Sequence, residues 1–131
     1  MTEIKDGLLY TKEHEWVRLE DDTAVMGITD YAQSQLGDIA YVDLPETGKE
    51  VSQSAFMCDI ESVKAVSDIF APVSGTVLAA NRELDDSPEL INTQPYEAWI
   101  VKIKMSDREE LKTLLDAVSY KVHVEKVSAK K

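Results

Sequence analysis

Short runs of strand-forming residues, separated by turn residues, fill most of this chain and limit its fold more than any other feature. The last run also alternates. It places Ile100, Lys102 and Lys104 on one side of a strand and Trp99, Val101, Ile103 and Met105 on the other. This pattern predicts a mainly β fold. The runs are Gly7–Tyr10, Glu15–Leu19, Thr23–Ile28, Ile39–Asp43, Ala55–Ile60, Asp68–Val73, Gly75–Ala80 and Trp99–Met105.

Two short helices are expected to interrupt these strands. Asp30 and Gln33 form a capping box at the start of Tyr31–Gln35, and Gly37 predicts a left-handed end to that helix. Ser87 followed by proline predicts a single helical turn over residues 88–91.

The C-terminal segment changes from strand-like to helical character. Ser106 and Glu109 form another capping box, so we expect a helix to begin near Asp107. Residues 120–125 alternate like a strand yet also fit a continuing helix, and propensity does not decide between the two. Residues 128–131 are expected to form a frayed basic tail. The apolar residues at helical spacing are Leu111, Leu114, Leu115 and Val118.

The length and charge of the chain limit the number of domains and the kinds of partner that it can have. A chain of 131 residues suits one domain, here 1–131, with a core over about 7–105 and a helical segment over about 106–127. Its 25 acidic and 14 basic residues give a net charge of -11, which disfavours nucleic acid and anionic membrane as partners and favours basic protein surfaces. No apolar stretch approaches the ~20 residues that span a bilayer. Residues 1–6 are too acidic and polar for a targeting peptide, so we predict a cytoplasmic protein.

Lys64 lies between two apolar runs, at the expected tip of a hairpin. The tip sequence Val63–Val66 contains no Gly, Asn or Asp, and it exposes valines whose burial would stabilise the fold. Such exposure is easier to understand if a partner covers the tip. An exposed, rigidly presented amine is typical of an attachment point for a prosthetic group, although a plain surface lysine is the alternative. No base, nucleophile and orienting group occur together, so we expect no enzyme activity.

Several blocks of the sequence carry a resemblance to one family. Glu61–Ala65, with the sequence Glu-Ser-Val-Lys-Ala, resembles the lipoylation motif of the glycine cleavage system H protein family. Biotin carriers differ by methionines beside the lysine, and lipoyl domains of 2-oxoacid dehydrogenases differ by Asp-Lys-Ala. The other blocks occur in the family's order at Tyr10–Val17, Gly27–Gln33, Leu36–Ile39, Leu44–Gly48, Ala71–Gly75 and Pro88–Asn92.

The resemblance implies a barrel-sandwich hybrid fold with short peripheral helices and a helical C-terminus. It implies lipoate bound covalently to Lys64 by a lipoyl ligase or transferase. The implied function is a non-catalytic shuttle, which takes the aminomethyl group of glycine from a pyridoxal-phosphate glycine decarboxylase to a tetrahydrofolate-dependent aminomethyltransferase. Dihydrolipoamide dehydrogenase would then reoxidise the carrier. The alternative is an H-like paralogue that acts as lipoyl donor or relay for other lipoylated complexes.

Family members shelter the loaded arm in a surface cleft, which suggests further site residues. Glu15 and Asp68 are candidates to hold the aminomethyl cation, although both could be ordinary acids at strand ends. Gln35 stands where some relatives have a histidine, and Glu61 is a candidate for arm sheltering or recognition. A metal site is not expected, because His14 and His123 with the one cysteine lack a ligand spacing. The segment 93–98 also departs from the family, which generally has a longer loop with glycine before the tryptophan.

Overall fold

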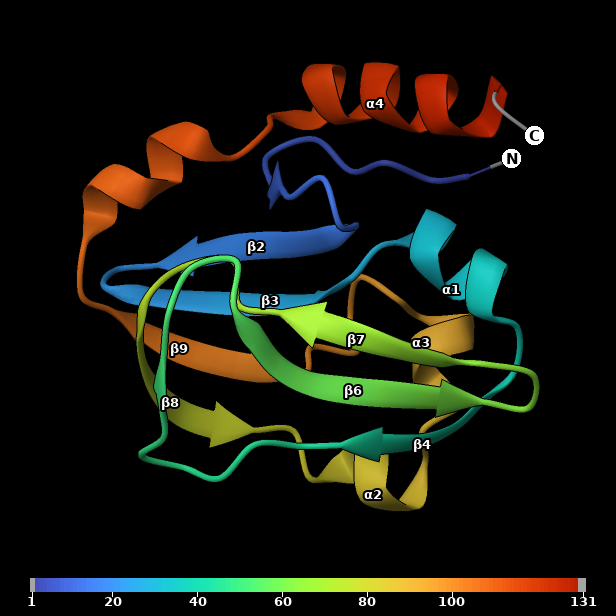
Figure 1. Ribbon diagram of the computed structural model, residues 1–131, viewed down its shortest axis with the longest axis horizontal. Coiled ribbons are helices and arrows are strands. Elements are labelled where there is room, and N and C mark those ends of the chain that lie inside the picture. The colour runs from blue at the N-terminus through green and yellow to red at the C-terminus, as the bar shows by residue number, and fades with distance from the viewer. Residues whose placement is uncertain (1, 130–131) are drawn as a thin grey trace.

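The computed structural model describes residues 2–129, and its strands form two open antiparallel sheets (Figure 1). The larger sheet has six strands in the order β1-β2-β3-β9-β8-β5, and the smaller has three in the order β4-β6-β7. The strands are β1 (Leu9–Tyr10), β2 (Glu15–Glu20), β3 (Thr23–Ile28), β4 (Ile39–Asp43), β5 (Glu50–Val51), β6 (Phe56–Ser62), β7 (Val66–Phe70), β8 (Gly75–Ala80) and β9 (Val101–Met105). The helices are α1 (Asp30–Leu36), α2 (Glu83–Asp86), α3 (Leu90–Thr93), the 3-10 helix η1 (Arg108–Thr113) and α4 (Ala117–Ala129).

The expected fold class is confirmed: the chain is mainly β, with short helices and a helix at its C-terminus, and neither sheet closes on itself. Every expected run overlaps a strand, but the sequence analysis missed the two-residue strand β5 and the short helix α2. Strand β5 is too short to show alternation. It pairs Val51 with Gly75 at the edge of the larger sheet.

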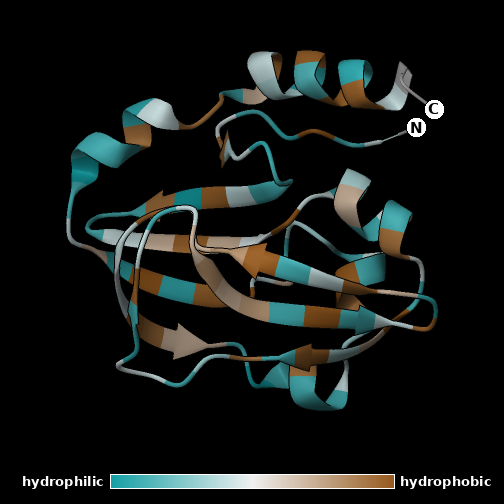
Figure 2. Ribbon diagram, viewed as in Figure 1, coloured by the Kyte–Doolittle hydropathy of each residue, from teal (hydrophilic) through white to brown (hydrophobic). Residues whose placement is uncertain are grey.

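The main hydrophobic core draws side chains from both sheets. Met26 and Ile103 contribute from the larger sheet, and Ile60 and Ile69 from the smaller one, all nearly or fully buried. Figure 2 shows hydrophobic and hydrophilic segments alternating along β6 and β7, as expected for strands with one face on a core. The predicted alternation of β9 is confirmed, but Ile100, placed with the lysines by that pattern, is also fully buried.

A second, aromatic cluster joins α4 to the N-terminal segment and the larger sheet. Tyr10 of β1 and Tyr120 of α4 stack with ring centroids 4.5 Å apart and planes 4° from parallel. Trp16, Tyr31 and Tyr96 belong to the same buried cluster. The helix α4 thus lies along the N-terminal segment (Figure 1) and attaches the C-terminal segment to it through aromatic contacts.

The C-terminal segment is helical but is not one helix, which corrects the expectation of a helix running on from Asp107. The 3-10 helix η1 ends before Leu114, whose backbone is extended, and Leu115 pairs with Tyr10 through two backbone hydrogen bonds of 2.7 and 2.8 Å. Leu115 therefore pairs with strand β1 instead of continuing a helix, and Leu111 and Leu114 pack against the main core. Residues 120–125 lie within α4. Of the expected basic tail, residues 128 and 129 also belong to α4, and 130 and 131 lie outside the described residues.

The expected helix starts are shifted by one or two residues. Thr29, not Asp30, caps α1, because its Oγ1 accepts a 3.2 Å hydrogen bond from the backbone N–H of Ala32. Gly37 ends α1 with the expected positive φ of 80°, but its ψ of -156° is extended rather than left-handed helical. Helix α3 begins at Leu90 without a side-chain cap, not at residue 88.

Candidate functional site

Lys64 lies in the tight connection between β6 and β7, which Ser62 holds together. The Ser62 hydroxyl accepts hydrogen bonds from the backbone N–H groups of Lys64 at 3.3 Å and Ala65 at 3.1 Å. The backbone N–H of Ser62 donates to the carbonyl of Ala65 at 2.8 Å, and that of Val63 donates to the carbonyl of Asp38 at 3.0 Å. A serine side chain thus stabilises a turn that lacks the usual glycine or asparagine.

The Lys64 side chain is exposed, as predicted, and lies across Gly37. A Cβ atom built on Gly37 would lie 3.3 Å from Lys64 Cε and 3.8 Å from Nζ. Its neighbours Val63 and Val66 are 74% and 64% exposed. Among residues 2–129, no side chain or backbone group forms a hydrogen bond or ion pair with the Lys64 amine. The amine is therefore open to reaction, while its aliphatic stem rests on the end of α1.

The smaller sheet presents acidic rows of side chains next to Lys64. Strand register places Glu61 opposite both Tyr41 and Val66, one row from the turn. Two residues farther along β6, the row consists of three aspartates, with Asp59 paired to both Asp43 and Asp68. Like charges directly opposite on a sheet are unfavourable. Together with Glu61, the three aspartates make the surface of the hairpin strongly acidic. The exposed Val63 and Val66 make it partly apolar.

A hollow of about 150 Å³ lies beside the same hairpin and brings two predicted site residues together. Gln35 and Leu36 line it from the end of α1, and Asp68 lines it from β7. The next residue after Leu36 is Gly37, on which the Lys64 stem rests. The hollow therefore opens within a few residues of the point where the Lys64 side chain lies. Glu61 does not line it.

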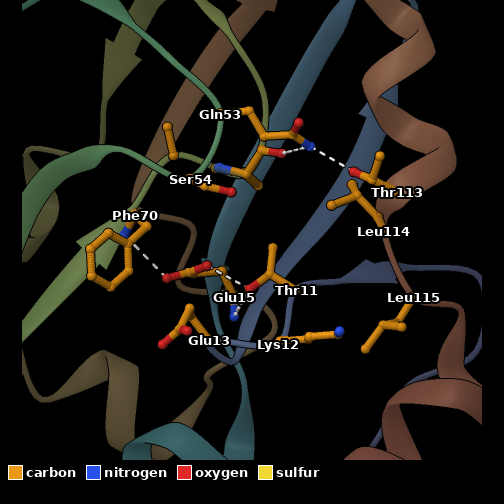
Figure 3. Close-up of a pocket in the computed structure, with 12 residues that line it drawn as sticks. Thr11, Lys12, Glu13, Glu15, Gln53, Ser54, Phe70, Thr113, Leu114 and Leu115 are labelled. Carbon is orange, nitrogen blue, oxygen red and sulfur yellow. Dashed lines mark hydrogen bonds between the residues drawn. The ribbon is translucent and has the colours of Figure 1, made fainter.

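Glu15 lies apart from Gln35 and Asp68, in the wall of a larger cavity of about 430 Å³ (Figure 3). It is only 1% exposed, and its carboxyl accepts hydrogen bonds from Thr11 Oγ1 at 2.5 Å and from the backbone N–H of Phe70 at 3.1 Å. Burial is the main cause that raises the pKa of Glu15, to about 7. Glu15 is thus not an ordinary exposed acid at a strand end. Glu15 and the pair Gln35 and Asp68 thus line different hollows.

His14 is a wall residue of the smaller hollow that the sequence analysis did not assign to the site. Its Nδ1 lies 2.9 Å from the hydroxyl of Tyr120, on the C-terminal helix. Burial, with a smaller contribution from His123, lowers its pKa to about 4, so the ring is neutral at pH 7. Because Tyr120 is 106 residues away along the chain, no local sequence signal indicates this contact.

Two features, a cluster of metal-ligating side chains and a membrane-spanning helix, were sought in the part of the chain that the structure describes. No three His, Cys, Asp or Glu side chains in it gather in a way that could hold a metal ion. None of its helices is long and apolar enough to cross a bilayer. Cys58 is buried, and burial raises the pKa of its thiol to about 12, which makes it unreactive.

Comparisons with known proteins relate this chain to one family. Residues 8–127 match the family model described as "Glycine cleavage H-protein". A probable glycine cleavage system H protein of Pyrococcus furiosus is 63% identical over 119 residues, covering 89% of each chain. One from Halothermothrix orenii is 50% identical over 125 residues, covering 95% of this chain and 98% of the relative.

A solved structure shares the fold. The crystal structure of a glycine cleavage system H protein from Mycobacterium marinum superposes with a TM-score of 0.81 at 35% identity, covering 89% of this chain and 95% of the other. Family model, close relatives and fold therefore agree over nearly the whole chain. The chain belongs to the glycine cleavage system H protein family, the lipoyl carriers of that system.

Proposed function

We propose that this chain carries its lipoyl group on Lys64, as one lipoyl-carrier domain over residues 1–131. One observation carries the proposal: Lys64 is exposed at a tight hairpin turn, its amine makes no hydrogen bond or ion pair with the described residues, and Gly37 leaves room for its stem. An amide bond to lipoate needs a free, accessible amine. Rigid flanking strands would then present the modified side chain to enzymes without disturbing the core.

The hollow beside α1 fits a sheltering role for the arm. Leu36 and Ile69 supply apolar surface, and Gln35 and Asp68 supply polar groups at the same place. When bound, the lipoyl group would supply a reactive disulfide that takes up the aminomethyl cargo and electrons from glycine. That cargo is cationic, so the carboxylate of Asp68 would attract it and the amide of Gln35 could accept a hydrogen bond from it.

Glu15 has a different role in this proposal from the one expected from the sequence. Its carboxyl already accepts bonds from Thr11 and the backbone of Phe70, the residue at the end of β7. With a pKa near 7 it is only partly ionised at neutral pH, which makes it a weak partner for a cation. We propose that Glu15 holds the end of β7 in place, and that Asp68 provides the charge facing the arm.

The proposed partners are enzymes that act on the hairpin, and the carrier itself needs no catalytic groups. They are glycine decarboxylase, the aminomethyltransferase, dihydrolipoamide dehydrogenase and a lipoyl ligase or transferase. Exposed valines beside Glu61 and the aspartate row offer each of them an apolar spot surrounded by negative charge, which fits a basic docking surface. Tethering raises the effective concentration of the cargo at each docked enzyme. We place this exchange in the cytoplasm, since the relatives come from prokaryotes.

Intact mass measured after co-expression with a lipoyl ligase and lipoate tests the attachment site. Wild type and Lys121→Arg, which changes an exposed lysine of α4, should each gain the mass of one lipoyl group. Lys64→Arg should gain none while keeping the wild-type circular dichroism spectrum. Lipoylation of the Lys64→Arg chain would refute the assignment.

The same preparations test the glycine cleavage role against the lipoyl relay. With glycine decarboxylase and glycine, lipoylated wild type and Lys121→Arg should support release of CO₂, and Lys64→Arg should not. A lipoylated wild type that supports no glycine-dependent release, yet donates lipoate to other carriers through a transferase, would favour the relay.

A further inference from the structure

We propose that Tyr120, on the C-terminal helix, is a positioning residue for the hollow that shelters the arm. Its hydroxyl contacts two residues that shape this hollow: His14, which lines it, and Thr29, which caps the helix that lines it. This inference rests on the proposed sheltering role and adds to it a dependence on the C-terminal helix, which lies far from Lys64 along the chain.

The first contact fixes the His14 ring. Tyr120 is fully buried, and its hydroxyl lies 2.9 Å from His14 Nδ1. The backbone of His14 has a φ of 72°, a strained value that persists only where surrounding contacts hold it. The ring also lies 4.8 Å, centroid to centroid, from the ring of Tyr31, which lines the hollow as well. Losing the hydroxyl would free one wall of the hollow to move.

The second contact fixes the start of α1. The Tyr120 hydroxyl lies 2.7 Å from Thr29 Oγ1, and that same oxygen accepts the capping hydrogen bond from Ala32. Helix α1 then carries Gln35 along the hollow and ends beneath the Lys64 stem at Gly37. The Tyr120 hydroxyl is thus linked to the end of the hollow nearest Lys64 through one short helix.

The hydrogen-bond directions are consistent through these contacts. Because the Thr29 oxygen accepts from Ala32, its own proton can go to the Tyr120 oxygen, and the Tyr120 proton can go to His14 Nδ1. This arrangement requires a neutral His14 with its proton on Nε2, which agrees with the lowered pKa of that ring. The Thr29 oxygen, the Tyr120 oxygen and His14 Nδ1 then each have a partner in a buried place, where an unpaired group is costly.

Tyr10 offers a matched control within the same stacked pair. Its ring is parallel to that of Tyr120 at 4.5 Å, and it too is fully buried. Its hydroxyl, however, donates to the carbonyl of Lys5 at 2.6 Å, and neither residue lines the hollow. Tyr10→Phe and Tyr120→Phe therefore each remove one buried hydroxyl from one aromatic pair, and only Tyr120→Phe loses contacts to the hollow.

The experiment uses lipoylated wild type, Tyr10→Phe and Tyr120→Phe, each checked for one lipoyl group by mass. The arms are loaded with glycine and the decarboxylase, the enzyme is removed, and the spontaneous release of formaldehyde is followed. We expect release roughly three- to tenfold faster from Tyr120→Phe, which breaks both contacts of the hydroxyl, and wild-type release from Tyr10→Phe. Backbone amide NMR shifts that loading causes at Gln35 and Asp68 should shrink only in Tyr120→Phe.

Other results of this experiment would overturn either the role of Tyr120 or the proposed shelter. Equal release and equal shifts in all three proteins would overturn the role of Tyr120. If Tyr120→Phe fails to fold, His14→Asn replaces it, since asparagine tolerates positive φ while losing the ring, and wild-type release from it would also overturn the inference. Release from folded wild type as fast as from the urea-unfolded protein would instead refute the proposed shelter itself, while the mass measurement still tests Lys64 separately.

Discussion

Gly37 lies directly beneath the side chain of Lys64, and a methyl group on residue 37 would meet Lys64 Cε at 3.3 Å. The backbone of Gly37, with φ 80° and ψ -156°, occupies a region that is essentially restricted to glycine. This residue therefore ends α1, turns the chain into β4 and leaves room for the lysine stem. The end of α1 and the position of the Lys64 side chain therefore both depend on Gly37.

Gly37→Ala should lower the free energy of unfolding by about 1–3 kcal/mol, because an alanine must strain to adopt this backbone. Crowding contributes less, since the Lys64 stem can shift. Urea unfolding measures the loss. Gly48→Ala is the control, with φ 92° and nothing within 4 Å of the added carbon. Both variants should lose stability, but only Gly37→Ala should slow lipoylation, and equal lipoylation rates would contradict the contact.

Gly27 and Trp16 should show strong energetic coupling. A Cβ atom on Gly27 would lie 2.8 Å from Trp16 Cε2 and Cζ2, atoms of a fully buried indole that donates to the Pro95 carbonyl at 2.9 Å. Gly27→Ala should therefore cost about 1–3 kcal/mol of stability by overpacking. Trp16→Phe removes the crowding atoms, so the alanine should cost about 1 kcal/mol less in that background.

A double-mutant cycle by urea unfolding measures this coupling. Tyr96, whose ring centroid lies 6.3 Å from that of Trp16, supplies the control background, because Tyr96→Phe leaves the indole in place. Gly27→Ala should cost as much in Tyr96→Phe as in wild type. Additive costs in the Trp16→Phe background would show that residue 27 is not limited by the indole.

His14 and Glu15 should give opposite pH dependences of stability. The pKa of Glu15 is raised from 4.5 to about 7, so between these values the folded chain holds more protons there than the unfolded chain, and stability falls as pH rises. The pKa of His14 is lowered from 6.5 to about 4, so the unfolded chain holds more protons in that window, and stability rises with pH. In wild type the two effects largely offset each other between pH 4.5 and 6.5.

Substituting one of the two residues should reveal the pH dependence of stability that the other one causes. Glu15→Gln leaves His14, so its free energy of unfolding should rise from pH 4.5 to 6.5 more steeply than that of wild type, by up to a few kcal/mol. His14→Asn leaves Glu15, and its stability should fall over the same range. Urea titrations at several pH values measure both, with Glu125→Gln as an exposed control on α4. Profiles parallel to wild type in both variants would contradict the burial of these groups.

Much of the fold could be predicted from the sequence because its signals are local. Alternation predicted β9, and turn residues bounded the other strands that build the core. The exposed lysine was predictable from its place between two apolar runs, and the resemblance of Glu61–Ala65 indicated its chemistry. Strand β5 was missed because two residues are too few to show a period.

The parts that failed depend on contacts between distant segments. Leucines at helical spacing predicted a helix through Leu115, but pairing with Tyr10 satisfies its backbone instead. The burial of Glu15 against Phe70 likewise gave no local signal, and its expected role at the arm stays a prediction. Tyr120 gave no local signal, because its hydroxyl acquires its partners only when α4 packs on the N-terminal segment.

Asp59→Asn should separate docking from stability on the acidic face. Asp59 lies between Asp43 and Asp68 in one cross-strand row, so removing its charge should leave stability unchanged or raise it by a few tenths of a kcal/mol. Lipoylation by the ligase should nevertheless slow a few-fold, and its rate should depend less steeply on salt, because less charge attracts a basic partner. Glu125→Gln removes one exposed charge from α4 and should leave both properties unchanged. Equal slowing in the two variants would mean that the partner responds to net charge and not to this face of the hairpin.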